Sequence, residues 1–148
     1  MLKEVIDKNL WAFYEEATDW EDAIVKSCSR LVEEGVVSKE YSQELITCVK
    51  KYGPYIVLEE GIAMPHSTQE GKNVFKTEIA FTKFEKEVVF DEENKANLFF
   101  TLASENPDIH LENMQKLMEV LGNDELKEEL FKIKTIEELK ELSKKYNI

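Results

Sequence analysis

Several residue types are scarce in this chain, and each scarcity excludes a kind of structure. The 148 residues include only two cysteines, two histidines, three prolines and five glycines. Cys28 and Cys48 are too few and too isolated for a disulfide framework or a metal cage. No internal repeat, low-complexity tract or Gly/Ser linker suggests a domain boundary. We therefore expect residues 1–148 to form one domain.

Positive charge and long apolar runs are also in short supply. The chain has 19 lysine and arginine residues against 31 acidic ones, for a formal net charge of −12. This charge argues against nucleic acid as a partner, because phosphate backbones require a basic surface. An acidic surface can steer a basic protein partner toward it or simply keep the protein in solution. No apolar run is long enough for a membrane helix, and the start at residues 1–4 lacks the apolar region of a signal peptide. We expect a cytoplasmic protein without membrane insertion.

The apolar residues that are present predict helices on both sides of a block of strands. Periodic apolar stripes and helix-stop residues predict helices over about 2–8, 20–34, 39–52, 107–121 and 124–131, and from 136 on. Runs of β-type residues predict strands at 10–14, 56–58, 62–64, 77–84, 88–90 and 97–103, and the polar segment 67–73 is expected to be a loop. The run at 97–103 is apolar on both faces, which is typical of a central strand. The fold class is therefore α/β, a single-domain layered sandwich with a mixed β-sheet flanked by helices on both faces.

Capping residues predict where three of these helices begin. Asp19 and Ser38 each precede an apolar stripe, and Thr135 is followed three residues later by Glu138 as a capping box. Cys28 falls on an apolar helix face, so we expect a buried structural thiol rather than a reactive one.

The first histidine follows a short apolar run and a rigid proline. His66 comes directly after Pro65, which fixes the backbone and has no amide proton to donate. A histidine held at the end of a buried strand can be presented at a surface depression with little conformational freedom. Gly61 and Ala63 are small, so we expect them to allow a partner or an anionic group to approach closely.

The second histidine lies at the start of an amphipathic helix. His110 is four residues before Met114 and shares its face with Leu117, Met118 and Leu121, so it is expected to point toward the sheet. The unpaired amides and the dipole of a first helical turn favour an anion. A phosphoryl group on one imidazole, held near a helix start and a second imidazole, is a coherent site, because a nucleophilic histidine needs its other ring nitrogen fixed by a partner.

Other interpretations of these residues remain open. A histidine at a helix start is more often a structural group. A zinc site would need a third ligand, and although Asp108 and Glu112 are near His110, their spacing matches no recognised ligand pattern. A catalytic triad on Ser67 is not supported, because no Gly-x-Ser-x-Gly elbow surrounds it. We expect no metal.

Taken together, the two segments resemble a known family. Gly61-Ile-Ala-Met-Pro-His66 is similar to the active-site motif of the type-2 (fructose/mannitol-type) enzyme IIA domains of the sugar phosphotransferase system, and His110-Leu-Glu-Asn-Met-Gln-Lys-Leu117 is similar to the segment with their second histidine. The preceding Gly53-Pro-Tyr-Ile-Val-Leu58 resembles the ascorbate-type branch. The resemblance covers nearly the whole chain.

The resemblance implies a phosphorelay. It implies that His66 accepts a phosphoryl group at Nε2 from the histidine phosphocarrier protein, and that His110 orients or stabilises the group. The group then passes to a cysteine of an enzyme IIB partner, which phosphorylates a sugar during uptake by the membrane enzyme IIC. No cofactor is implied, and selectivity for the sugar lies mainly in the membrane partner. The alternative is a regulatory module of the same fold, whose phosphorylation state controls a partner protein.

Three departures from the family pattern bear on the site. Ser67 occupies a position where glycine, alanine or cysteine is usual, and its hydroxyl could donate to the phosphoryl oxygens or simply be tolerated. Glu59 and Glu60 stand where small residues or proline are expected, and they would disfavour a phosphoryl anion unless they point away. The one arginine, Arg30, is far from the motif, so Lys50 and Lys51 are the nearest candidates for cationic support.

Overall fold

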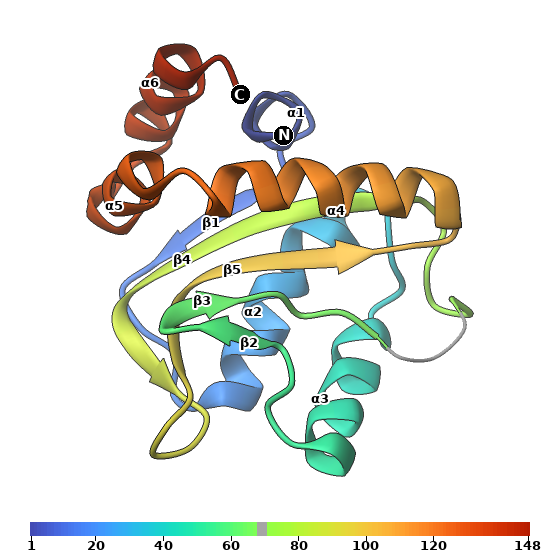
Figure 1. Cartoon of the computed structure of the whole chain (residues 1–148). Helices are drawn as coiled ribbons and strands as arrows, with labels where there is room; N and C mark the ends of the chain where they lie inside the picture. The colour runs from blue at the N-terminus through green and yellow to red at the C-terminus, as the bar shows by residue number, and fades with distance from the viewer. Residues whose placement is uncertain (68–70) are drawn as a thin grey trace.

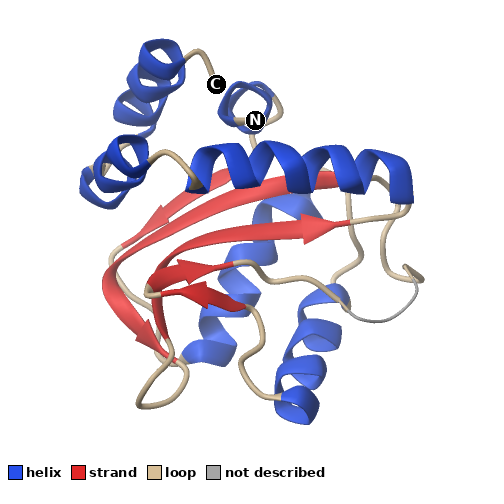
Figure 2. Ribbon diagram, viewed as in Figure 1, coloured by secondary structure: helices blue, strands red, loops and turns tan. Residues whose placement is uncertain are grey.

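A five-stranded mixed sheet forms the centre of the part of the chain that the structure describes, residues 1–67 and 71–148 (Figures 1 and 2). In this computed structural model the strand order is β1-β4-β5-β3-β2. The β1–β4 and β3–β5 pairs are parallel, whereas the β4–β5 and β2–β3 pairs are antiparallel. The strands are β1 (Trp11–Tyr14), β2 (Val57–Glu59), β3 (Gly61–Ala63), β4 (Glu78–Val89) and β5 (Lys95–Ala103).

Helices cover both faces of this sheet, as the sequence predicts. One layer contains α2 (Trp20–Glu33) and α3 (Tyr41–Tyr52). The opposite layer, in which α4 runs across the upper face in Figure 1, contains α1 (Leu2–Asp7), α4 (Pro107–Leu121), α5 (Asp124–Lys132) and α6 (Ile136–Tyr146). Within the described residues no helix is both long and apolar enough to cross a lipid bilayer.

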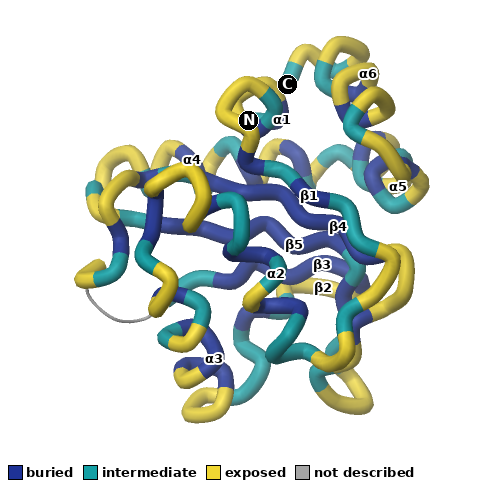
Figure 3. Tube along the Cα trace, turned by 180° about the vertical axis from the view of Figure 1, so that it is seen from behind, coloured by how far each residue is buried: buried dark blue, intermediate teal, exposed yellow. Residues whose placement is uncertain are grey.

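The central strands are buried on both faces, as expected for β5. Figure 3 shows β4 and β5 dark blue along much of their length. Alternating residues face opposite layers: Phe81 packs with the α1, α4, α5 and α6 side, and its neighbour Ala80 packs with α2 and α3. The two layers therefore share one sheet but have separate apolar clusters. Both cysteines are buried, and burial raises the pKa of the Cys28 thiol to about 12, consistent with a structural role.

Two of the predicted helix starts are confirmed and one is wrong. Asp19 Oδ1 accepts a hydrogen bond from the Asp22 amide at 2.8 Å, and Thr135 Oγ1 accepts one from the Glu138 amide at 3.3 Å. Ser38 does not cap α3, which begins at Tyr41. Its hydroxyl instead donates to Asn73 Oδ1 at 3.1 Å, because residues 37–40 form a bridge and a turn before the helix.

The two strands expected at 77–84 and 88–90 are one strand, β4. The prediction separated them because three consecutive charged residues, 85–87, interrupt the apolar pattern. The structure accommodates these exposed residues by a shift in the β4–β5 register between Lys83 and Val88, rather than by ending the strand. On α4, the expected stripe is correct at Leu117 but wrong at Met118, which is 46% exposed.

Candidate functional site

One pocket of about 530 Å³ brings the two histidines together. It lies where the segment after β3, the helix α3, the end of β5 and the start of α4 meet. Ser67, the third residue expected at the site, also contributes to it. The other described lining residues are Tyr41, Glu44, Gly71, Val74, Leu102, Ser104, Glu105 and Pro107. Part of the loop predicted at 67–73, residues 68–70, lies outside the described residues.

The imidazole of His66 is held in one tautomer. Its Nδ1 atom lies 2.6 Å from the backbone carbonyl oxygen of Met64. A carbonyl oxygen only accepts, so Nδ1 donates its proton there, and Nε2 of the neutral ring carries a lone pair. The residue is half-buried at the pocket. The ring is thus prepared to act as a nucleophile through Nε2.

The backbone on either side of this imidazole is fixed to neighbouring segments. The Met64 amide donates to the Ile56 carbonyl at 2.8 Å, and the Leu102 amide at the end of β5 donates to the Pro65 carbonyl at 2.9 Å. Pro65 needs no partner for an amide proton, which suits it to the position after β3. The chain leaving β3 therefore presents His66 in a defined place beside β5.

Two tyrosines that the sequence did not single out support this arrangement. The Tyr55 hydroxyl donates to the backbone carbonyl of His66, and its ring meets the imidazole edge-on, with centroids 5.0 Å apart and an interplanar angle of 87°. The Tyr41 hydroxyl donates to the Leu102 carbonyl at 2.6 Å. Burial raises the pKa of both phenols, so both remain protonated donors at neutral pH. Tyr41 stands in no sequence pattern that would mark it, and Tyr55 lies in the segment 53–58 that resembles the ascorbate-type branch, a resemblance that by itself predicts no role for it.

The second histidine is positioned by the start of α4. Asn106 caps this helix, with Oδ1 accepting from the amides of Asp108 and Ile109 at 3.0 and 3.3 Å. The Thr77 hydroxyl oxygen accepts from the Glu105 and Asn106 amides, both at 2.9 Å, and so ties the helix start to the sheet. His110 reaches the pocket from this first turn, as predicted. Burial, and then the proximity of His66, lower the pKa of His110, so that ring is neutral near pH 7.

The expectation that open amides at this helix start receive an anion is wrong. The amides of Asp108 and Ile109 are occupied by the Asn106 side chain, and the His110 amide donates to the Asn106 carbonyl at 3.0 Å. Pro107 has no amide proton. Contacts to a bound group are therefore expected from other groups of the pocket rather than from these amides.

No lysine or arginine lines the pocket within residues 1–67 and 71–148. Lys50, proposed from the sequence as a cationic support, pairs instead with Glu21 at 3.3 Å. Lys51 lies over the ring of Tyr52, 5.2 Å from its centroid. The pocket instead contains two carboxylates, those of Glu44 and Glu105. The prediction that Lys50 or Lys51 of α3 gives cationic support to the pocket is therefore incorrect.

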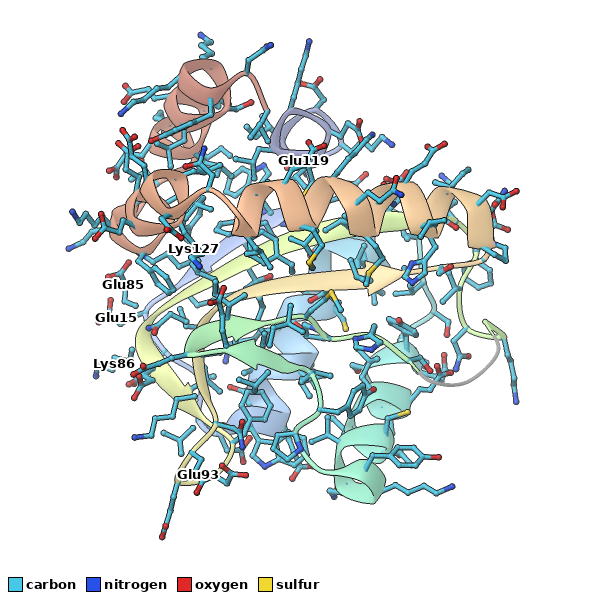
Figure 4. All side chains as sticks on the ribbon, viewed as in Figure 1. Glu15, Glu85, Lys86, Glu93, Glu119 and Lys127 are labelled. Carbon is cyan, nitrogen blue, oxygen red and sulfur yellow. The ribbon has the colours of Figure 1, made fainter. Side chains whose placement is uncertain are left out.

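Glu59 meets the condition set for it, because it is directed away from the pocket, whereas the small motif residues Gly61 and Ala63 act differently from expectation. Glu59 pairs with Lys127 on α5 at 3.1 Å and does not line the pocket; Lys127 is labelled in Figure 4. Gly61 and Ala63 are buried and do not line the pocket either. A Cβ atom on Gly61 would lie 2.7 Å from the Phe131 ring, so its small size accommodates α5 rather than a ligand.

Among the described residues, no group of three or more histidine, cysteine or acidic side chains is arranged to hold a metal ion. What the pocket does offer is one imidazole with an available Nε2 lone pair beside a second neutral imidazole. Such a pair suits nucleophilic attack on an electrophilic centre such as phosphorus, with the second ring available to donate a hydrogen bond.

Comparison with known proteins places these features in one family. Residues 4–146 match the family described as "Phosphoenolpyruvate-dependent sugar phosphotransferase system, EIIA 2". A relative from Shigella boydii, the ascorbate-specific PTS system EIIA component, is 30% identical over 135 residues, which cover 89% of this chain and 87% of the relative.

Solved structures agree with the sequence relatives. The solution structure of the mannitol-specific cryptic phosphotransferase enzyme IIA from Escherichia coli superposes with a TM-score of 0.83 at 27% identity, covering 95% of this chain and 96% of that one. The mannitol enzyme IIA in a complex with phosphorylated enzyme IIB from Escherichia coli gives a TM-score of 0.73 at 29% identity, covering 88% of this chain and 92% of that one. The α/β sandwich expected from the sequence is therefore confirmed.

Proposed function

Because the chain belongs to the EIIA 2 family of the phosphoenolpyruvate-dependent sugar phosphotransferase system, we propose that residues 1–148 act as one phosphocarrier domain with His66 as the phosphoryl acceptor. The observation that carries the assignment of His66 is the hydrogen bond from its Nδ1 to the Met64 carbonyl. This bond leaves Nε2 as the nucleophilic atom in the pocket. His110 reaches the same pocket from α4, and among the described residues no hydrogen bond comparable to that of His66 fixes its tautomer, so we assign it the supporting role.

The proposed transfer exchanges one phosphorus–nitrogen bond for another. The Nε2 lone pair of His66 attacks the phosphorus of a phosphohistidine on the histidine phosphocarrier protein. The phosphorus–nitrogen bond of the donor breaks, and its electron pair returns to the donor imidazole. Little covalent chemistry is asked of the protein, so positioning of the attacking nitrogen supplies most of its contribution. The fixed tautomer and the anchored backbone at Met64 and Pro65 provide that positioning.

His110 and Ser67 are proposed to contact the transferred group. A neutral His110 carries one ring N–H that can donate to a phosphoryl oxygen without the deep stabilisation that a full positive charge would give. The Ser67 hydroxyl lies in the same pocket and can donate a second hydrogen bond. Weak hydrogen-bond donors stabilise the phosphohistidine only modestly, which suits an intermediate whose phosphoryl group must be transferred to another protein.

In the second half-reaction we propose that a cysteine thiolate of an enzyme IIB partner attacks the phosphorus. The bond from phosphorus to His66 Nε2 then breaks, and the lone pair returns to the imidazole. The structure of a related mannitol enzyme IIA with phosphorylated enzyme IIB supports this kind of partner. We propose a cytoplasmic carrier that acts through enzyme IIB on the sugar taken up by a membrane enzyme IIC. Relatives named as ascorbate-specific and as mannitol-specific support an ascorbate-like or a mannitol- or fructose-like substrate.

The test of the acceptor is to incubate the protein with the phosphorylated histidine phosphocarrier protein and measure bound phosphate. Wild type is expected to gain an acid-labile, base-stable phosphate. His66→Ala is expected to gain none while keeping the circular dichroism spectrum of the wild type. His110→Gln is the matched control: it should still be labelled, but more slowly. Full labelling of His66→Ala would rule out the assignment.

A chase with enzyme IIB separates transport from regulation. If the protein feeds a transporter, adding enzyme IIB should move the phosphate from His66 to a cysteine thiol, which makes the label sensitive to iodine. Retention of the label on His66 in the presence of enzyme IIB would favour the regulatory alternative.

A further inference from the structure

Glu44 brings a carboxylate from α3 into the pocket that holds both histidines. One carboxylate oxygen, Oε1, accepts a hydrogen bond from Asn73 Nδ2 at 2.9 Å. The other, Oε2, is buried and has no hydrogen-bond partner within residues 1–67 and 71–148. A buried carboxylate oxygen without a partner is costly for a folded protein, so its presence at this position calls for a physical explanation.

The carboxylate is oriented by a second layer of contacts. Asn73 Oδ1 accepts from the Ser38 hydroxyl at 3.1 Å, and the Ser38 amide donates to the Asn73 carbonyl at 2.8 Å. These bonds fix the Asn73 amide so that Nδ2 is directed to Glu44. The arrangement holds one carboxylate oxygen in place and leaves the other unpaired.

Among the described residues that line the pocket, no lysine or arginine offsets the negative charge of Glu44. The influence of the carboxylate reaches both tyrosines beside the acceptor. Burial raises the pKa of Tyr41 and of Tyr55, and the negative charge of Glu44 raises both further. Glu44 therefore acts electrostatically on the groups that surround His66.

We propose that Glu44 sets the phosphoryl transfer potential of His66 by repelling the phosphoryl dianion. This inference rests on the proposed function, because it requires a phosphoryl group on Nε2. Like charges that share one pocket raise the free energy of the phosphorylated form relative to the free form. Glu44 makes and breaks no bond. It shifts the equilibrium of phosphoryl exchange, in which the Nε2–phosphorus bond forms as the phosphorus–nitrogen bond of the donor breaks, away from phosphorylated His66. Transfer of the phosphoryl group to the next protein is thereby favoured.

The experiment measures the equilibrium constant for phosphoryl exchange between the phosphorylated histidine phosphocarrier protein and this protein, by phosphorus NMR of the mixture. Glu44→Gln keeps the size of the side chain and an oxygen for Asn73 but removes the charge. We expect the equilibrium to move toward phosphorylated His66 by about tenfold. Glu93→Gln, at the exposed turn between β4 and β5 labelled in Figure 4, removes one charge elsewhere and should leave the equilibrium unchanged.

A second variant separates charge from structure. Glu44→Asp keeps the negative charge but shortens the side chain, which weakens the bond to Asn73. It is expected to leave the equilibrium within about twofold of the wild type. Equal equilibrium constants for wild type, Glu44→Gln and Glu93→Gln would overturn the inference, and so would equal shifts for Glu44→Gln and Glu44→Asp. Failure of the proposed function is distinguishable, because the wild type would then take up no phosphate or His66→Ala would take it up.

Discussion

Single residues around His66 differ in what they contribute, and Tyr55 is the clearest case. Its hydroxyl bonds the His66 carbonyl while its ring packs against the imidazole. Tyr55→Phe removes only the hydroxyl, so we expect the rate of phosphoryl uptake from the phosphorylated carrier to fall about fivefold, the equivalent of one neutral hydrogen bond of ~1 kcal/mol. Tyr52→Phe, at an exposed neighbouring ring, is the control and should match the wild type. An unchanged rate for Tyr55→Phe would remove its positioning role.

At the same scale, His110 makes stability depend on pH. Burial and His66 lower the pKa of His110, so the unfolded chain binds a proton at this residue more readily than the folded one. As pH falls below the unfolded value of about 6.5, protonation therefore favours unfolding. Wild type should lose more stability than His110→Gln between about pH 7.5 and about pH 5.5, as measured by urea unfolding. Equal losses in the two proteins would contradict this expectation.

The sequence identified the residues with reactive or polar side chains in the pocket better than it identified the residues that position them. His66, His110 and Ser67 were predicted as site residues, and the structure brings all three to one pocket. Their proposed roles stay predictions. Tyr41, Tyr55 and Glu44 were missed because their contacts span segments that are distant in sequence or run to backbone atoms, and no local pattern records such contacts. Lys50 was chosen for its sequence proximity, yet its side chain pairs with a neighbouring helix.

At the scale of elements, Gly61 determines how β3 meets α5. Its φ angle is +88°, and a Cβ there would lie 2.7 Å from the Phe131 ring. Gly61→Ala should therefore lower the free energy of unfolding by about 3 kcal/mol, from backbone strain together with steric overlap. Chemical denaturation measures this loss.

Gly35→Ala provides the matched control for this substitution. Gly35 has a φ of +70° but no heavy atom within 4 Å of the added Cβ, so only the strain term of about 1 kcal/mol is expected. Equal losses at the two glycines would show that the contact with Phe131 contributes nothing. Recovery of stability in Gly61→Ala combined with Phe131→Leu would support it.

Most element boundaries were predictable because local chemistry sets them. Asp19 and Thr135 cap their helices as predicted, since a side-chain oxygen beside free amides is a local signal. The exceptions have non-local causes. The continuity of β4 through three charged residues depends on its pairing with β5, and the start of α3 depends on the bond between Ser38 and Asn73. Pairing between distant segments is not visible in a local apolar pattern.

For the whole molecule, the shared sheet predicts one cooperative unfolding transition. The apolar clusters lie on opposite faces of the same strands, so the loss of one helical layer exposes the sheet on which the other layer packs. The two tryptophans lie in different surroundings. Trp20 packs with the apolar residues of the α2 and α3 side, whereas Trp11 on the edge strand packs with the α1 and α4 side and also carries Arg30 of α2 5.5 Å from its ring centroid. Fluorescence of Trp11→Phe and of Trp20→Phe should give coincident midpoints once the stability change of each variant is measured by circular dichroism. Separate transitions would contradict the single-domain proposal.

The sandwich itself was predictable at this scale, because the apolar patterns place helices before and after a block of strands. The strand order was not predicted. It follows from pairings such as β1 with β4, which join residues about 70 positions apart.

The bonds that fix Met64, Pro65 and His66 to their surroundings have one last consequence. Met64 and His66 are anchored to the adjacent residues Ile56 and Tyr55, and Pro65 is anchored to Leu102 on β5, so the proposed phosphorylation of His66 does not require the main chain there to move. The two forms then share the same backbone arrangement around the pocket and differ by the phosphoryl group itself. A partner protein would then distinguish the phosphorylated from the free form mainly by the electrostatic potential of the phosphoryl group. Its preference for one form over the other should weaken as added salt screens that potential.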